Sequence, residues 1–184
     1  MNPVKTFRTF ARYNAWMNDK LYGAAETLTD EQRKEDRGAF FSSVHGTLNH
    51  ILTGDLVWLE RFQVSGASAL ADVPVSLLEP FRGLDAELFE DFAELRIARD
   101  AVDEMILAWC DRDLTDGWLD DILVFKTKSN PNVSRELPAG LCVTHFFNHQ
   151  THHRGQVTTL LSQCGIDPGV TDLMAMPGAI PKQT

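Results

Sequence analysis

Apolar residues recur at steps of three and four along four separate stretches of the chain. In the first stretch Phe7, Phe10, Met17 and Leu21 fall on one stripe, a spacing typical of helices that bury one face. We predict four helices, over residues 2–28, 44–62, 84–112 and 139–163.

Capping residues support three of these boundaries. The first helix opens with Asn2-Pro3, a capping side chain followed by proline at the first helical position. Ser42 and Ser43 can each cap the second helix. Gly165 stands directly after the last helix, where glycine commonly ends one.

The connections between these helices are long enough for a crossover. Residues 27–38 are polar, and residues 63–83 contain two glycines and two prolines. Within 113–138, a short apolar run at 122–125, a turn at 129–132 and a second run at 133–136 predict a small hairpin or an irregular loop. The leading architecture is an all-α four-helix bundle in one domain over 1–184, with 168–184 as a surface tail. The alternative is a helical domain with a small two-stranded flap.

The charge balance and the cysteines narrow the function class. The 184 residues include 17 Lys and Arg against 26 Asp and Glu, a net charge of −9, which disfavours nucleic acid as a partner. No apolar run is long enough to span a membrane, so we expect no membrane partner. Three cysteines without regular spacing argue against a disulfide framework and favour a reducing, cytoplasmic location. The acid-free first eighteen residues also resemble a transit peptide superficially, but they fit a core helix.

Six histidines are confined to two short windows, at 45, 50, 145, 149, 152 and 153. His149 and His153 are one helical turn apart at the border of the apolar face, so they can share one ion. A third ligand from the second helix would be His45 or His50. The helical wheel slightly favours His45, but periodicity alone does not choose between them. Position 150 is Gln, so the zinc-protease motif is absent. The competing interpretation is a pair of core-edge histidines without metal.

Asp55 lies close to the centre of the second apolar stripe, where a carboxylate must be paired or hydrogen-bonded. One interpretation makes it orient a ligand histidine. The other pairs it with Asn14, Tyr13 or a backbone amide to fix helix register. We interpret Trp58 as core or pocket wall.

Three motifs together resemble the DinB family. They are Tyr13-Asn14-Ala15-Trp16-Met17-Asn18, then Leu48-Asn49-His50-Ile51-Leu52 with Asp55 and Trp58 after it, and then the run 148–156, Asn-His-Gln-Thr-His-His-Arg-Gly-Gln. The run 148–156 is the most specific, and the resemblance covers nearly the whole chain.

The resemblance implies an up-down-down-up bundle with a divalent metal held by three histidines. Carried over by position, the ligands are His50, His149 and His153. His145 joins Asp55, Asn14 and Trp58 as a neighbouring or pocket residue, and a homodimer is implied. We expect zinc or nickel, with iron or manganese as alternatives.

Three protein ligands leave a coordination position open, which is the layout of a catalytic zinc site. The wider family includes thiol S-transferases and hydrolases. We therefore predict a metal-dependent enzyme acting on a small molecule, either by transfer of a low-molecular-weight thiol or by hydrolysis. The alternative is a non-catalytic metal-binding bundle with a stress-response or ligand-binding role.

Overall fold

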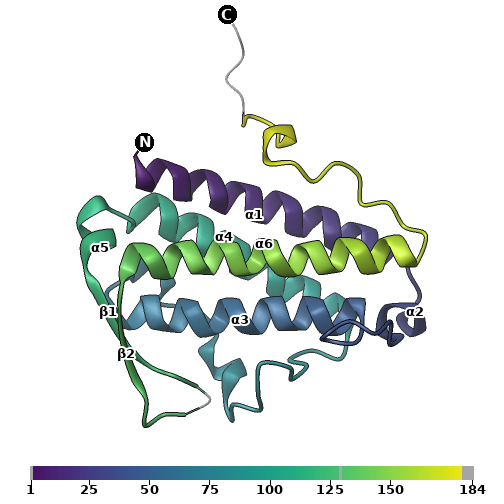
Figure 1. The fold of residues 1–184 in the computed structure, drawn as a ribbon, viewed down its shortest axis with the longest axis horizontal. Helices are drawn as coiled ribbons and strands as arrows, with labels where there is room; N and C mark the ends of the chain where they lie inside the picture. The colour runs from purple at the N-terminus through teal and green to yellow at the C-terminus, as the bar shows by residue number, and fades with distance from the viewer. Residues whose placement is uncertain (1, 129, 180–184) are drawn as a thin grey trace, which may run out of the picture.

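The computed structural model describes residues 2–128 and 130–179, and these form a helical bundle with a small hairpin at one end (Figure 1). The four long helices are α1 (Pro3–Glu26), α3 (Val44–Val64), α4 (Phe92–Arg112) and α6 (Ala139–Gln163). The shorter elements are α2 (Asp30–Lys34), η1 (Ser68–Leu70), η2 (Val75–Leu78), α5 (Asp116–Asp120), β1 (Ile122–Lys126), β2 (Ser134–Pro138) and η3 (Leu173–Ala175).

The contacts between side chains fix the direction of each long helix. α1 runs parallel to α6, and α3 runs parallel to α4, whereas α3 and α6 are antiparallel neighbours (Figure 1). This is the predicted up-down-down-up arrangement. The pairs that show it are Phe7 with Phe147 and Asn14 with Arg154, Asp55 with Arg99 and Phe62 with Trp109, and His50 with His153 and Phe62 with Phe146.

Three of the predicted capping residues, Asn2, Ser43 and Gly165, are confirmed. The Asn2 side chain accepts a hydrogen bond from the Lys5 amide, and Ser43 caps α3 by accepting from the Gly46 amide. Gly165 follows α6 with φ of +76°, a left-handed conformation that glycine adopts without steric penalty.

The predicted start of the third helix is wrong, since α4 begins at Phe92 rather than near residue 84. Asp91 caps it by accepting from the Glu94 amide. The segment before it is held against α3, because the Asn49 side-chain oxygen accepts from the amides of Leu88 and Phe89. Backbone groups of residues 84–91 thus form hydrogen bonds with α3 instead of with one another in a helical turn.

A further short helix, α2, lies in the segment predicted as a polar connection. Thr29 and Gln32 cap it reciprocally, each side chain accepting from the other's backbone amide. The Thr-x-x-Gln spacing of a capping box was present in the sequence and identifies this turn.

The segment before α6 is an antiparallel hairpin, as predicted. β1 pairs with β2 so that Val124 lies opposite Glu136. Residues 63–83 form the predicted long connection and contain η1 and η2. No helix in the described ranges has the length and apolarity needed to cross a bilayer.

The described part of the tail lies along α1. The Tyr13 hydroxyl donates to the Thr171 carbonyl at 2.6 Å, and Lys20 donates to the Val170 carbonyl. Residues 180–184 of the predicted surface tail lie outside the described residues.

Candidate metal centre

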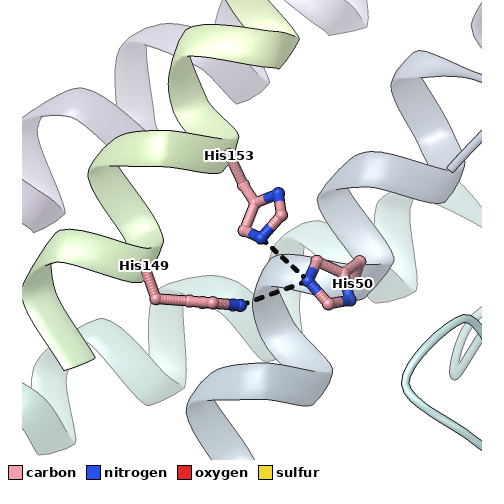
Figure 2. Close-up of side chains that lie close together, drawn as sticks. All are labelled: His50, His149 and His153. Carbon is pink, nitrogen blue, oxygen red and sulfur yellow. Dashed lines mark hydrogen bonds between the residues drawn. The ribbon is translucent and has the colours of Figure 1, made fainter. Parts of the chain in front are cut away.

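Three imidazoles meet between α3 and α6 (Figure 2). The Nε2 atom of His50 lies 3.2 Å from Nε2 of His149 and 3.1 Å from Nε2 of His153. His149 and His153 project from consecutive turns of α6 toward His50 of α3 (Figure 2). The structure thus brings together the three residues named by the family resemblance.

Hydrogen bonds at the Nδ1 atoms of His50 and His153 determine that the Nε2 atom of each ring carries the free lone pair. The Nδ1 atom of His50 lies 2.7 Å from the Leu84 carbonyl oxygen, which can only accept, so Nδ1 carries the proton. The Nδ1 atom of His153 lies 2.8 Å from Oε1 of Gln156, which likewise accepts. In the neutral rings, the two Nε2 lone pairs therefore face each other across 3.1 Å. A cation between them removes this repulsion.

Burial keeps these imidazoles in the neutral form that binds metal. Burial lowers the pKa of His50 from its ordinary 6.5 to about 4, with a further decrease from His153, and the Leu84 carbonyl acts in the opposite direction. Burial, followed by the neighbouring His153 and His50, lowers the pKa of His149 to about 3. The pKa of His153 is also lowered by burial. All three nitrogens can therefore act as ligands at neutral pH.

The spacing of the nitrogens fits a small divalent ion. With zinc–nitrogen bonds of about 2.0–2.1 Å, the nitrogens of a tetrahedral site lie about 3.3 Å apart, close to the separations around His50. Within the described residues, no fourth His, Cys, Asp or Glu side chain joins the group. The protein thus offers three ligands to an ion that takes four or more.

Two residues that the sequence analysis did not single out shape the site. Gly54 packs against His149, and a Cβ atom at this position would lie 2.7 Å from Cε1 of that ring. Phe41 stacks on His50, with ring centroids 3.7 Å apart and planes inclined by 15°. Gly54 lies one turn after His50, and this spacing was the available signal. Phe41 carries no such signal, because its contact is made only in the folded chain.

A cavity of about 520 Å³ lies between α3 and α6 and adjoins the cluster at His149. Gly54, Trp58 and Arg61 line it from α3, and His145 and His149 line it from α6. The rings of Trp58 and His145 lie 5.0 Å apart. Both candidate pocket residues, Trp58 and His145, therefore border the same space as His149.

The remaining histidines lie outside the cluster. His45, slightly favoured by the helical wheel, is fully buried, and its Nε2 atom lies 2.9 Å from the Phe89 carbonyl oxygen. His152 is exposed beside His153 and contacts Gln156. His45 therefore helps hold the segment that precedes α4, rather than lying at the three-histidine cluster.

Asp55 and Asn14 belong to a buried polar network on the core side of the same helices. The Asp55 carboxylate accepts from Arg99 at 2.5 Å and from Gln150 at 2.6 Å, so its partners are not Asn14, Tyr13 or a backbone amide. Asn14 donates to Asp103 at 3.0 Å and accepts from Arg154. No hydrogen bond joins either residue to the three histidines in the described structure.

This network contains two acidic and two basic groups. Arg99 links both acids, since its second nitrogen lies 3.0 Å from Asp103. Burial lowers the pKa of Arg99, but Asp103 and Asp55 raise it by more, so its guanidinium stays charged. Burial lowers the pKa of Arg154 to about 10, which leaves it charged at neutral pH. Burial raises the pKa of Asp55 and of Asp103, and Arg99 acts in the opposite direction. With both carboxylates ionised, the network is close to electrically neutral although it lies in the core.

Comparisons with known proteins identify the family. The family model described as the DinB family matches residues 1–183. Protein DinB of Bacillus subtilis (strain 168) is 29% identical over 167 residues, which cover 87% of each chain. A crystal structure of a DinB-like protein from Bacillus cereus ATCC 10987 is similar with a TM-score of 0.59 at 22% identity, covering 84% of this chain and 91% of that one, and so shows the shared fold. The chain belongs to the DinB family.

Proposed function

We propose that this protein is a divalent-metal-dependent enzyme that acts on a small molecule by thiol transfer or by hydrolysis. The observation that carries the proposal is the convergence of three imidazole lone pairs, one of them from a ring that also lines a cavity. Zinc and nickel suit an all-imidazole donor set, and iron and manganese are the alternatives to test.

A metal bound by His50, His149 and His153 would lower the pKa of a water or a thiol that shares it. In thiol transfer, the sulfur forms a bond to an electrophilic carbon, the leaving group departs with the bonding electrons, and the thiol proton is released. In hydrolysis, one product takes the hydroxyl group of water and the other product takes the remaining proton. The chain itself contributes the three ligands and the cavity that receives the substrate.

The three-ligand set favours this proposal over a purely structural clip between α3 and α6. Structural zinc sites usually have four protein ligands, whereas catalytic sites keep one position for water or substrate. In the described ranges the cluster has three such ligands, and His149 lies at the cavity wall.

Metal analysis of protein purified without a histidine tag tests the proposal. We expect one equivalent of zinc or nickel after reconstitution, and loss of that equivalent in His149→Ala/His153→Ala. The exposed neighbour variant His152→Ala is the control and should bind normally. Because the pKa values of His50 and His149 are lowered to about 4 and about 3, binding should persist at pH 6, where an ordinary histidine is mostly protonated.

Activity decides between the enzyme and the non-catalytic bundle. We expect the reconstituted protein to conjugate a low-molecular-weight thiol to an electrophile, or to hydrolyse an ester or amide, and we expect the double variant to do neither. Substoichiometric binding of zinc, nickel, iron and manganese would contradict the metal site. Full metal binding without turnover of any of these thiols, esters or amides would support the non-catalytic role instead.

A further inference from the structure

The cavity beside His149 is lined by two antiparallel helices, α3 and α6. On α3, His50, Gly54, Trp58 and Arg61 follow one another at steps of four, four and three residues, so they share one face. Gly54, Trp58 and Arg61 line the cavity. It therefore extends from His149, one of the three clustered histidines, past an aromatic wall, to an arginine.

Arg61 is held in place by aromatic rings rather than by an acid. Its guanidinium carbon lies 4.4 Å from the centroid of Trp58 and 4.3 Å from that of Phe125. Among the described residues no carboxylate oxygen lies within 4.0 Å of its guanidinium nitrogens, and no side-chain hydrogen bond from it is found. The adjacent Glu60 is instead engaged by Lys128 at 2.7 Å.

An arginine held between aromatic rings in this way can bind an anion. A guanidinium remains protonated in proteins and presents a planar fork that matches a carboxylate. Arg61 is partly withdrawn from water, and this burial lowers its pKa. Glu60 acts on Arg61 from a distance, but no carboxylate of the described residues contacts its guanidinium, so an anionic ligand would supply the direct counter-charge. The stacked rings already fix the plane of the fork.

The length of the cavity limits the size of the ligand. His50 and Arg61 are eleven positions apart, which corresponds to about 16 Å along a helix axis. The guanidinium leans back over Trp58 toward the histidines, because side chains on a helix tilt toward its N-terminus. The ligand span is therefore about 10 Å, and Val57, Phe81 and Leu84 add apolar surface to the cavity wall.

We propose that the cavity binds an elongated organic acid, with its anionic group on Arg61, its apolar or aromatic middle against Trp58, and its reacting end at the three histidines. This inference rests on the proposed function, because it names the substrate class of that site.

The first experiment uses cobalt-loaded protein and two probes of equal length, 6-mercaptohexanoate and 6-mercaptohexan-1-ol. Binding of the thiol end is followed by the sulfur-to-cobalt charge-transfer band. We expect the acid to bind about tenfold more tightly than the alcohol, as for a charge-assisted hydrogen bond. Arg61→Gln should remove this preference and leave the alcohol unaffected, whereas Arg61→Lys should retain part of it. Arg12→Gln, an exposed arginine on α1, is the charge-matched control.

A second experiment needs no metal. The binding of 4-phenylbutanoate and of 4-phenylbutan-1-ol to the metal-free protein is measured by calorimetry, again in the wild type, Arg61→Gln, Arg61→Lys and Arg12→Gln. Thermal melting of each variant checks that it is folded. We expect a preference for the acid that depends on the charge at position 61.

The outcomes separate this inference from the proposed function. Equal binding of acid and alcohol in the wild type, or a preference that survives in Arg61→Gln, overturns the inference even if cobalt binds. A charge-dependent preference in the metal-free protein, together with no cobalt binding, supports the anion site and overturns the metal-dependent function.

Discussion

Gly54 shows how one missing side chain makes room for the ring of His149. The His149 ring occupies the space that a Cβ atom would need, 2.7 Å from its Cε1 atom. We predict that Gly54→Ala displaces this ring and weakens zinc binding by about 10- to 100-fold, the range seen when a neighbour that supports a ligand is changed. Competition with a chromophoric chelator measures this affinity.

Gly23→Ala on α1 is the matched control for this prediction. No heavy atom lies within 4 Å of the Cβ position at Gly23, so alanine should keep zinc affinity and stabilise the helix by up to about 1 kcal/mol. Equal zinc affinity in both variants would show that Gly54 does not set the position of His149.

At the same scale, sequence reasoning located the clustered histidines of α6 better than the clustered histidine of α3. The one-turn spacing of His149 and His153 was sufficient, because both lie on the same helix. The choice between His45 and His50 depended on where the apolar stripe has its centre. The segment before α4 also covers α3, so His45 is buried beneath that segment while His50 reaches the cluster. That cover is a tertiary feature which a helical wheel does not contain.

At the scale of elements, the segment 84–91, which directly precedes α4, is bonded both to Asn49 and to His50 of the histidine cluster. Asn49 accepts from two of its amides and also donates to the Phe89 carbonyl. Leu84 offers its carbonyl to His50. The leucine pattern predicted a helix here, but these side-chain bonds from α3 hold the segment in another conformation. The start of α1 and the end of α6 were predictable because Asn2 and Gly165 are local signals in the sequence.

We predict that Asn49→Ala destabilises the protein by about 1–3 kcal/mol, because buried amides of this segment lose their acceptor. Zinc affinity should fall as well, since the segment orients His50 through Leu84. Urea denaturation and chelator competition measure the two effects. Glu87→Ala, an exposed position in the same segment, should change neither. Normal zinc affinity in a destabilised Asn49→Ala protein would separate the segment from the metal site.

For the whole molecule, the buried network connects all four long helices. Arg99 lies between Asp55 and Asp103, and both its side chain and that of Asp55 are 1% exposed. We predict that Arg99→Met destabilises the fold by about 3–5 kcal/mol, because it leaves buried carboxylates without their cation. Chemical denaturation at neutral pH measures this loss.

Arg96→Met, one turn earlier on α4, is the control. Arg96 pairs with Asp19 and Glu26 at the surface, where such pairs contribute about 0–1 kcal/mol. A loss at Arg99 no larger than that at Arg96 would contradict the importance of the network.

The network and the histidine cluster alternate along the same two helices. Gly54 precedes Asp55, His149 precedes Gln150, and His153 precedes Arg154. Since successive residues of a helix differ in direction by about 100°, contacts on the core side fix the rotation of α3 and α6 with no ion present. Under the proposed function, we therefore expect the three histidines to be in place before an ion binds. The ion recovered with the protein would then depend on which ions were supplied and on their relative affinities.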